Sequence, residues 1–265
     1  MAKLNIIVCV KQVPQTNEVR IDPETGILIR EGVPSITNPE DSNALEAALA
    51  LREEHGGNVL VVSMGPSQAE EALRDALAMG ADEAILLCDR AFAGADTLAT
   101  SYTVGSAIRK LGYFDLILCG TKTLDGNTGQ VGPQLAELLD LPQITYARRV
   151  EVQGEILRAE RASEECYELV ETSLPALVTV TKEINRPRIP SIDQIMQSYR
   201  EKEVQIWCAA DLEVDEHSVG LDGSATRMSR IYKPDFGKRT VEFIEGSTEY
   251  VVQGLLARLR DRHMI

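Results

Sequence analysis

The sequence predicts an α/β protein with a parallel, doubly wound sheet that carries helices on both faces. From about residue 4 to residue 140, short apolar runs alternate with longer segments of helical periodicity. Uninterrupted apolar runs are typical of strands buried on both sides of a parallel sheet. After Pro142 the pattern changes to alternating strands, which adds an antiparallel meander, and the chain closes with an extended C-terminal arm ending in a helix.

The strands expected in the parallel part of the sheet are apolar runs too short for helices. They are residues 4–10, 59–64, 84–88, 114–119 and 177–180. The first run resembles the apolar core of a signal peptide, but it lacks a small-residue cleavage site and Lys11 follows it directly. We therefore expect a first strand there.

The helices between these strands have start signals that follow from capping chemistry. A side chain that accepts a hydrogen bond, or a proline in the first turn, satisfies the free N–H groups of a helix start or removes one of them. These signals are, in chain order, Asn38-Pro39 with Asp41 or Ser42, Gly65-Pro66-Ser67, Asp96 and Pro133.

The second part of the chain predicts a different organisation. Residues 144–152, 155–161 and 166–172 form the expected meander, and a helix follows from about residue 193 to residue 202. Beyond it, apolar residues are too sparse for a core, which suggests a segment that wraps a partner. We therefore expect a nucleotide-binding α/β domain over residues 1–202, including the meander and a partner-docking loop. A C-terminal arm over residues 203–265 is expected to pack on another subunit.

Composition limits the classes of function. The chain has 265 residues and a net charge of −14, which argues against nucleic acid or an anionic membrane as a partner and suits a basic protein surface. Its five cysteines form no CxxC pair, so neither a disulfide framework nor a metal site is expected, as in a cytoplasmic protein. No Ser–His–Asp or Cys–His arrangement stands out, and no catalytic residue is assigned.

The most informative stretch is the polar loop between the fourth strand and the fourth helix. It combines Gly126, Gly129 and Gly132 with Asp125 and Thr128. A strand, a glycine-containing loop and a helix start direct backbone N–H groups at one point, which suits a phosphate or pyrophosphate. The alternative is an ordinary strand–helix connection. The loop matches neither the Walker pattern nor GxGxxG, so these motifs do not name the nucleotide.

Ligands of such sheets bind beyond the carboxyl ends of the strands. Here those ends are Cys9-Val10, Met64-Gly65, residues 89–94 and residues 119–130, which should meet at one rim. Asp96 caps the next helix, and Thr97 and Thr100 are neighbours in its first turns.

Several of these segments together resemble the β (small) subunit of electron-transfer flavoproteins. They are Val8 to Pro14, Asn38-Pro39, Ser63 to Pro66, Ala76 to Asp82 and Asp125 to Pro133, and the likeness extends over almost the whole chain. The family implies a heterodimer with a larger α subunit that carries a mobile flavin. Its β subunit holds a second adenine nucleotide, which is AMP in ordinary members and FAD in electron-bifurcating ones.

Residues 89–101 and Asp125-Gly126 resemble the bifurcating group. That resemblance implies that NAD(H) donates electrons to a β-subunit FAD. One electron then passes to ferredoxin or flavodoxin, and the other reaches a flavin-dependent dehydrogenase, such as an acyl-CoA dehydrogenase, through the α subunit. The chain departs from the usual loop of this group at Asn127, where Asp is usual, and at Gly129, where Ala is usual.

The resemblance and the predicted rim together define the candidate site residues. For cofactor binding they are Cys9, Val10, Asn38, Met64, Gly65, Asp96, Thr97, Thr100, Cys119, Gly120, Thr121, Asp125, Gly126, Asn127, Thr128, Gly129, Gln130 and Val131. Core packing is the alternative role for Cys9, Met64 and Cys119, and a solvated helix turn is the alternative for Thr97 and Thr100.

A proline-stiffened basic loop at residues 185–193 matches the family's dehydrogenase-docking position. Its docking candidates are Arg188, Ile189 and Ile192, and Ile192 stands where the family has an anchoring hydrophobic side chain. An incidental exposed loop is the alternative. Two other functions also stay open: an ordinary electron-transfer β subunit with structural AMP, and an adenine-nucleotide-binding signalling or stress protein.

Overall fold

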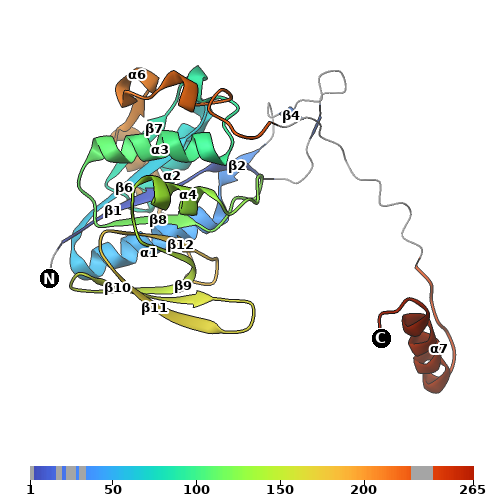
Figure 1. Ribbon diagram of the computed structural model, residues 1–265. Helices are drawn as coiled ribbons and strands as arrows, with labels where there is room; N and C mark the ends of the chain where they lie inside the picture. Colours follow the sequence, from blue (N-terminus) through green and yellow to red (C-terminus); the bar gives the residue numbers. More distant parts are fainter. Residues whose placement is uncertain (1–2, 16–19, 22–27, 30–33, 228–240) are drawn as a thin grey trace. The chain divides into compact units, whose positions relative to one another are not determined.

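A nine-stranded sheet runs through the larger of two units, Met1–Ser229. The computed structural model describes residues 3–15, 20–21, 28–29, 34–227 and 241–265. The strand order is β11-β10-β9-β12-β8-β1-β6-β7-β13 (Figure 1). Two short ribbons lie outside it: β2 (Gln12–Pro14) pairs with β5 (Ser35–Thr37), and β3 (Arg20–Ile21) pairs with β4 (Leu28–Ile29).

The strands from β12 to β13 are parallel and form the part of the sheet whose strand ends were predicted to form a rim. They are β1 (Leu4–Cys9), β6 (Gly57–Met64), β7 (Glu83–Leu87), β8 (Leu116–Gly120), β12 (Ala176–Val180) and β13 (Val204–Trp207). β9 (Gln143–Gln153) pairs parallel with β12, and β10 (Ile156–Ala162) and β11 (Tyr167–Ser173) continue it as the antiparallel meander.

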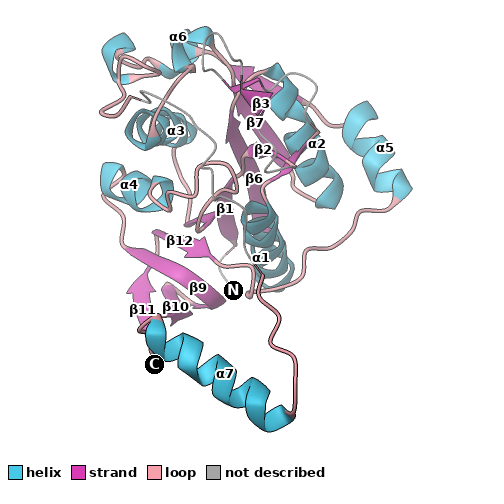
Figure 2. Ribbon diagram, turned by 90° about the vertical axis from the view of Figure 1, so that its right-hand side faces the viewer, coloured by secondary structure: helices cyan, strands magenta, loops and turns pink. Residues whose placement is uncertain are grey.

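Helices cover both faces of the sheet (Figure 2). The chain first steps from β1 to β6 and β7 through α1 (Pro39–His55) and α2 (Glu70–Met79), and both helices pack on one face. It then crosses back to β8 through α3 (Thr97–Leu111) and goes on through α4 (Val131–Leu138), which lie on the other face. Connections between parallel strands are right-handed. When the chain reverses its direction across the sheet, the helices that follow therefore lie on the face opposite to the earlier ones. The predicted doubly wound α/β fold is therefore confirmed.

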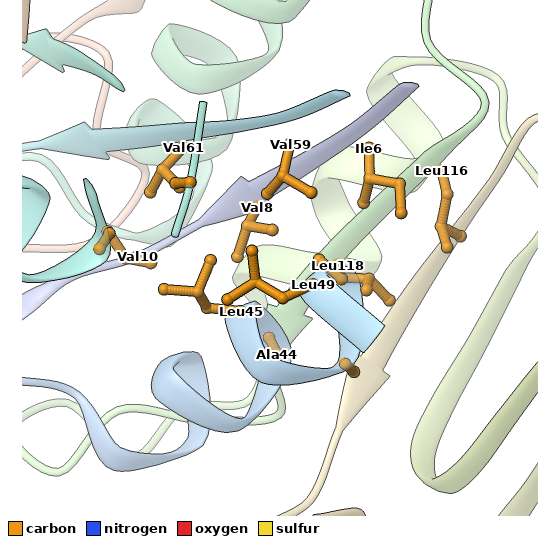
Figure 3. Packing of buried hydrophobic residues seen from close by; sticks show 14 of the residues in the cluster. Ile6, Val8, Val10, Ala44, Leu45, Leu49, Val59, Val61, Leu116 and Leu118 are labelled. Atoms are coloured by element: carbon orange, nitrogen blue, oxygen red, sulfur yellow. The ribbon is translucent and has the colours of Figure 1, made fainter. Parts of the chain in front are cut away.

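The core has two layers because successive strand residues point to opposite faces. On the side of α1, Ile6, Val8 and Leu118 pack against Leu45 and Leu49 of the helix (Figure 3). On the opposite side, Ile7 and its neighbours pack against α3 and α4. These strands are buried on both faces, which explains why the sequence shows runs and not alternation.

The segment after residue 202 differs from the expectation of a wrapping arm. β13 pairs with β7 and extends the sheet, so the short apolar run at residues 204–207 is an edge strand. Leu212 of α6 (Ala209–Leu212) and Val219 are buried in the second core layer. Before it, α5 (Ile192–Arg200) packs on α2. Residues 228–240 of the arm lie outside the described part.

The smaller unit, Arg230–Ile265, contains α7 (Thr248–Asp261). Ser247 caps this helix by accepting a hydrogen bond from the backbone N–H of Tyr250 at 3.3 Å. None of the residues of α7 is buried, although Val251, Leu255 and Leu256 lie along its length. That the chain beyond residue 202 contacts another subunit stays a prediction.

Leu118→Ala should lower the free energy of unfolding by about 2–5 kcal/mol, because it leaves a cavity in the centre of the sheet. Leu118 is fully buried, whereas Leu169 on the edge strand β11 is 74% exposed. Leu169→Ala removes the same atoms and is the matched control, with little expected change. Urea unfolding of both variants measures the difference, and equal losses would contradict the described core.

Candidate functional site

The rim predicted for the ligand lies where the chain reverses its direction across the sheet. β1 and β8 are adjacent there, with Cys9 directly opposite Cys119 in register. In open α/β sheets the crevice at such a reversal is the usual ligand position. The rim is continued by Met64 at the end of β6 and by the segment that follows β7.

A buried carboxylate holds the two central strand ends together. Asp41, in the first turn of α1, accepts the backbone N–H of Lys11 at 2.9 Å and that of Gly120 at 3.0 Å. A Cβ on Gly120 would lie 2.4 Å from the Asp41 Oδ1 atom, so only glycine allows this approach. Gly120 was predicted as a ligand-binding residue, and the structure gives it this role in packing.

The start of α1 also fixes the loop that follows β8. Asn38, which is 1% exposed, donates its side-chain amide to the Lys122 carbonyl at 3.0 Å and accepts the Leu124 N–H at 3.2 Å. Glu40 accepts the Lys122 N–H at 2.9 Å. Three hydrogen bonds from two residues at one helix start therefore set the course of the loop.

An ion pair joins the loop to the end of β1. The Lys11 ammonium lies 2.7 Å from the Asp125 Oδ2 atom. Burial acts to raise the pKa of Asp125, but the hydrogen bond and charge of Lys11, together with hydrogen bonds from Thr123 and Gly126, hold that pKa below its usual value. Asp125 also accepts the N–H of Gly126 at 2.8 Å, which shapes the turn that leads outward.

The outer part of the loop has the backbone that an anion site requires. Asn127 and Gly129 have φ values of 50° and 65°, in the left-handed region. No side chain caps the start of α4 at Gln130, so the first N–H groups of that helix stay available. A Cβ on Gly132 would lie 2.5 Å from the Thr179 Cγ2 atom, so glycine lets α4 start close to β12.

The start of α3 lies beside this loop. Thr97 donates its hydroxyl to the Gln130 side-chain carbonyl at 3.0 Å and so links the starts of α3 and α4. Asp96 caps α3 through the N–H groups of Leu98 and Ala99, at 3.0 and 3.1 Å. Its other oxygen accepts from the N–H and hydroxyl of Thr226 at 2.8 and 2.9 Å. Asp96 therefore ties a later segment to this rim.

The thiols at the centre of the rim are neutral. Burial, together with the nearby Asp41 charge, raises the pKa of Cys9 to about 12. Burial likewise raises the pKa of Cys119 well above its usual value. Cys119 is buried in the second core layer, and Cys9 and Met64 are half-buried against it. Cys9 and Met64 therefore offer an uncharged surface, which suits a flat ring better than a phosphate.

The structure brings most of the predicted binding residues to this one rim, in supporting or exposed positions. Thr121 is buried and donates its hydroxyl to the Val180 carbonyl at 3.0 Å. The loop surface is exposed from residue 126 to residue 128. The other predicted members are Val10, which is buried, Gly65, which packs on Ala69, and Thr100 and Val131, which are half-buried.

The docking candidates lie elsewhere, beside the middle and end of α1. The Arg188 guanidinium pairs with Glu46 at 2.8 and 3.0 Å and with Glu53 at 2.6 Å, and these carboxylates raise the pKa of the arginine. The positive charge of Arg188 is therefore paired with acidic side chains of the same chain. Ile189 and Ile192 are 92% and 77% exposed, so the segment presents two apolar side chains.

Sequence reasoning missed several residues that shape the rim. Asp41 has the signal of a helix cap, and nothing in its local pattern shows that it bonds residues 30 and 79 positions away. Lys11, Thr179 and Thr226 are similarly distant in sequence from their partners. No group of three or more metal-ligating side chains occurs in the described part of the chain. No described helix is long and apolar enough to span a membrane.

Comparison with known proteins finds a matching family model and several similar proteins. The electron transfer flavoprotein domain model matches residues 25–212. The electron transfer flavoprotein subunit beta of Thermoanaerobacterium thermosaccharolyticum is 56% identical over 262 residues, covering 99% of this chain and 100% of the relative. Subunit CarD of the caffeyl-CoA reductase-Etf complex of Acetobacterium woodii is 47% identical, with 99% and 100% covered. Protein FixA of Azorhizobium caulinodans is 42% identical, with 98% and 95% covered.

The protonation of Asp41 should give the fold a measurable pH dependence. Burial raises its pKa from 3.8 to about 7, against the lowering effect of its hydrogen bonds from Asn38, Lys11 and Gly120. The folded chain then holds an extra proton between about pH 4 and pH 7. Its free energy of unfolding should therefore fall as pH rises through that window, by at most about 1.4 kcal/mol per pH unit, and level off above it.

Asp41→Asn should remove this part of the slope, because the variant has no proton to release. Urea unfolding from pH 5 to pH 8 measures it. Asp140→Asn, at an exposed position, is the control and should keep the wild-type slope. A slope that persists unchanged in Asp41→Asn would assign the proton to another group.

Proposed function

Because the chain belongs to the electron transfer flavoprotein family and matches its β subunits, we propose that it is the β subunit of an electron-bifurcating member. In this proposal it pairs with an α subunit, binds FAD at the rim and uses NAD(H) as electron donor. The loop at residues 120–132 carries the proposal, because it lies at the reversal point of the sheet and leads into an uncapped helix start.

The residues present fit an adenine dinucleotide. The N–H groups of Gly126 and Asn127 are donated within the loop, to Asp125 and to the Thr123 carbonyl, so the groups that suit a pyrophosphate are those from Thr128 to Val131 at the start of α4. A helix start favours negative charge. The uncharged side chains of Cys9, Met64 and Cys119 suit a ring, and the ion pair between Lys11 and Asp125 fixes the edge of the loop. Bound FAD would supply the hydride and single-electron chemistry, while the protein binds and orients it.

The two departures from the bifurcating pattern are compatible with this loop. Asn127 and Gly129 both have positive φ, and Asn and Gly adopt that region at lower cost than most residues. Replacing Asp by Asn and Ala by Gly at these places thus eases the backbone conformation. This supports a functional loop in which the backbone, not a particular side chain, contacts the phosphates.

The rest of the proposal concerns partners. CarD is by its name a subunit of a complex between a reductase and an Etf. For this chain we propose docking to a flavin-dependent dehydrogenase through Ile189 and Ile192. Arg188 serves this role indirectly by fixing the segment on Glu46 and Glu53. Ferredoxin or flavodoxin is the proposed low-potential acceptor, and the proposed location is the cytoplasm.

The number of flavins per heterodimer tests the proposal. The αβ complex should release two flavins, and NADH should reduce the protein-bound flavin without a dehydrogenase present. Denaturation followed by separation of FAD and AMP gives the count. One flavin together with one AMP, and no reaction with NADH, would overturn bifurcation and favour the ordinary electron-transfer role.

Ile192→Ala should weaken docking of the dehydrogenase by about 2 kcal/mol, or roughly 30-fold, as expected for an exposed anchor side chain. Reduction of the complex by NADH should be unchanged, because residue 192 is on the docking segment and outside the rim. Leu169→Ala, another exposed apolar position, is the control. A parallel loss in docking and NADH reduction would show that Ile192 serves folding.

A further inference from the structure

Tyr146 adopts a backbone conformation that aromatic residues rarely tolerate. Its φ is 60°, although it lies within strand β9. Pairing between β9 and β12 shifts here: Ile144 pairs with Val178 and Ala147 with Val180, so Thr145 and Tyr146 lie opposite Thr179 alone. This is a β-bulge, a device that redirects a side chain and occurs often beside functional sites.

The bulge is held by a specific hydrogen bond. The backbone N–H of Tyr146 donates to the Thr179 hydroxyl at 3.1 Å, and Thr179 is 1% exposed. The ladder resumes directly afterwards, with the N–H of Thr181 donating to the Ala147 carbonyl at 3.0 Å. Tyr146 itself is 47% exposed, so burial of its ring in the core does not compensate for the strain.

The side chain of Tyr146 reaches the nucleotide loop. A Cβ on Gly129 would lie 3.8 Å from the Tyr146 hydroxyl and 3.6 Å from the Thr121 carbonyl oxygen. The methyl group of Thr179, in the same bulge, abuts Gly132. Tyr146 and Thr179 therefore lie next to the two glycines, Gly129 and Gly132, on either side of the start of α4.

We propose that Tyr146 is a positioning residue: the strained bulge places its phenol against Gly129 and so holds the phosphate-binding loop in its binding conformation. This inference rests on the proposed nucleotide site. It explains why a strained residue with a half-exposed ring stands at this point of the strand. The ring stabilises the binding conformation of the loop. The strained backbone that places the ring lowers the stability of the protein without ligand.

Replacing Tyr146 should therefore separate ligand affinity from stability. Tyr146→Gly and Tyr146→Asn relieve the left-handed strain and remove the ring. In the αβ complex stripped of nucleotide, both variants should bind FAD and AMP at least tenfold more weakly than wild type. Their urea midpoints should be equal to or above the wild-type value. Tyr146→Phe keeps the ring but removes the hydroxyl, the Tyr146 atom nearest to Gly129, and should recover only part of the lost affinity.

Glu213→Gly is the matched control. Glu213 has a φ of 51° at the end of α6, so the variant relieves the same kind of strain away from the loop. It should gain stability with unchanged FAD and AMP affinity. Wild-type affinity in Tyr146→Gly would overturn the proposal. A loss of both affinity and stability in Tyr146→Gly and Tyr146→Asn would also overturn it, because the ring would then serve the fold.

Amide hydrogen exchange keeps this test independent of the proposed function. In nucleotide-free complex, the amides of residues 126–131 should exchange faster in Tyr146→Gly than in wild type or Tyr146→Phe. Unchanged exchange of these amides would refute the positioning role of Tyr146. A wild-type complex that binds neither FAD nor AMP would instead refute the proposed function, while the exchange result still decides the role of Tyr146.

Discussion

The carboxylate of Asp41 is the contact on which the site depends. It spans two adjacent strand ends by accepting an N–H from each, at Lys11 and Gly120. A parallel sheet leaves backbone groups unsatisfied where its strands end, and burying them without partners is costly. One buried side chain satisfies two such groups and brings β1, β8 and α1 to a common point. Asp41 thus fixes the point at which the loop after β8 begins, and Asn38 and Glu40 hold the residues that follow.

Helix α1 also holds the proposed docking segment, through side chains farther along the helix. Its first residues, Asn38, Glu40 and Asp41, hold the nucleotide loop. Farther along, Asn43 exchanges amide hydrogen bonds with Asn185, and Glu46 pairs with Arg188. The proposed nucleotide loop and the proposed docking segment are thus attached to one rigid element. The geometry of each is set by side chains that project from the same helix.

The elements of the fold were predictable because their signals are local. Apolar runs marked β1, β6, β7 and β8, and Asn38 and Asp96 marked helix starts that the structure confirms. The parallel edge strand β13 was not predicted, since its short run at residues 204–207 pairs with a strand 120 positions earlier. Membership of the family is confirmed, whereas the role of each site residue remains a prediction.

The roles of the site residues were hard to predict from the sequence for the same reason: they depend on partners that are distant in the chain. The left-handed backbone of Tyr146 has no signature in its neighbours, because the bulge depends on Thr179, which lies 33 positions later. Arg188 occupies a basic loop that suggests a free charge, yet two acidic side chains of α1 neutralise it. The local sequence shows which residues have reactive or charged side chains. Only the folded structure shows which of these side chains are already bonded to other residues of the chain.

The raised thiol pKa values at the rim have a consequence for chemical durability. Thiolates, and not thiols, react with peroxides and alkylating agents. Cys9 and Cys119 face each other across neighbouring strands and stay protonated, because burial disfavours their charged forms. The same burial that shapes the rim therefore keeps these two cysteines in the thiol form, which is the less reactive form.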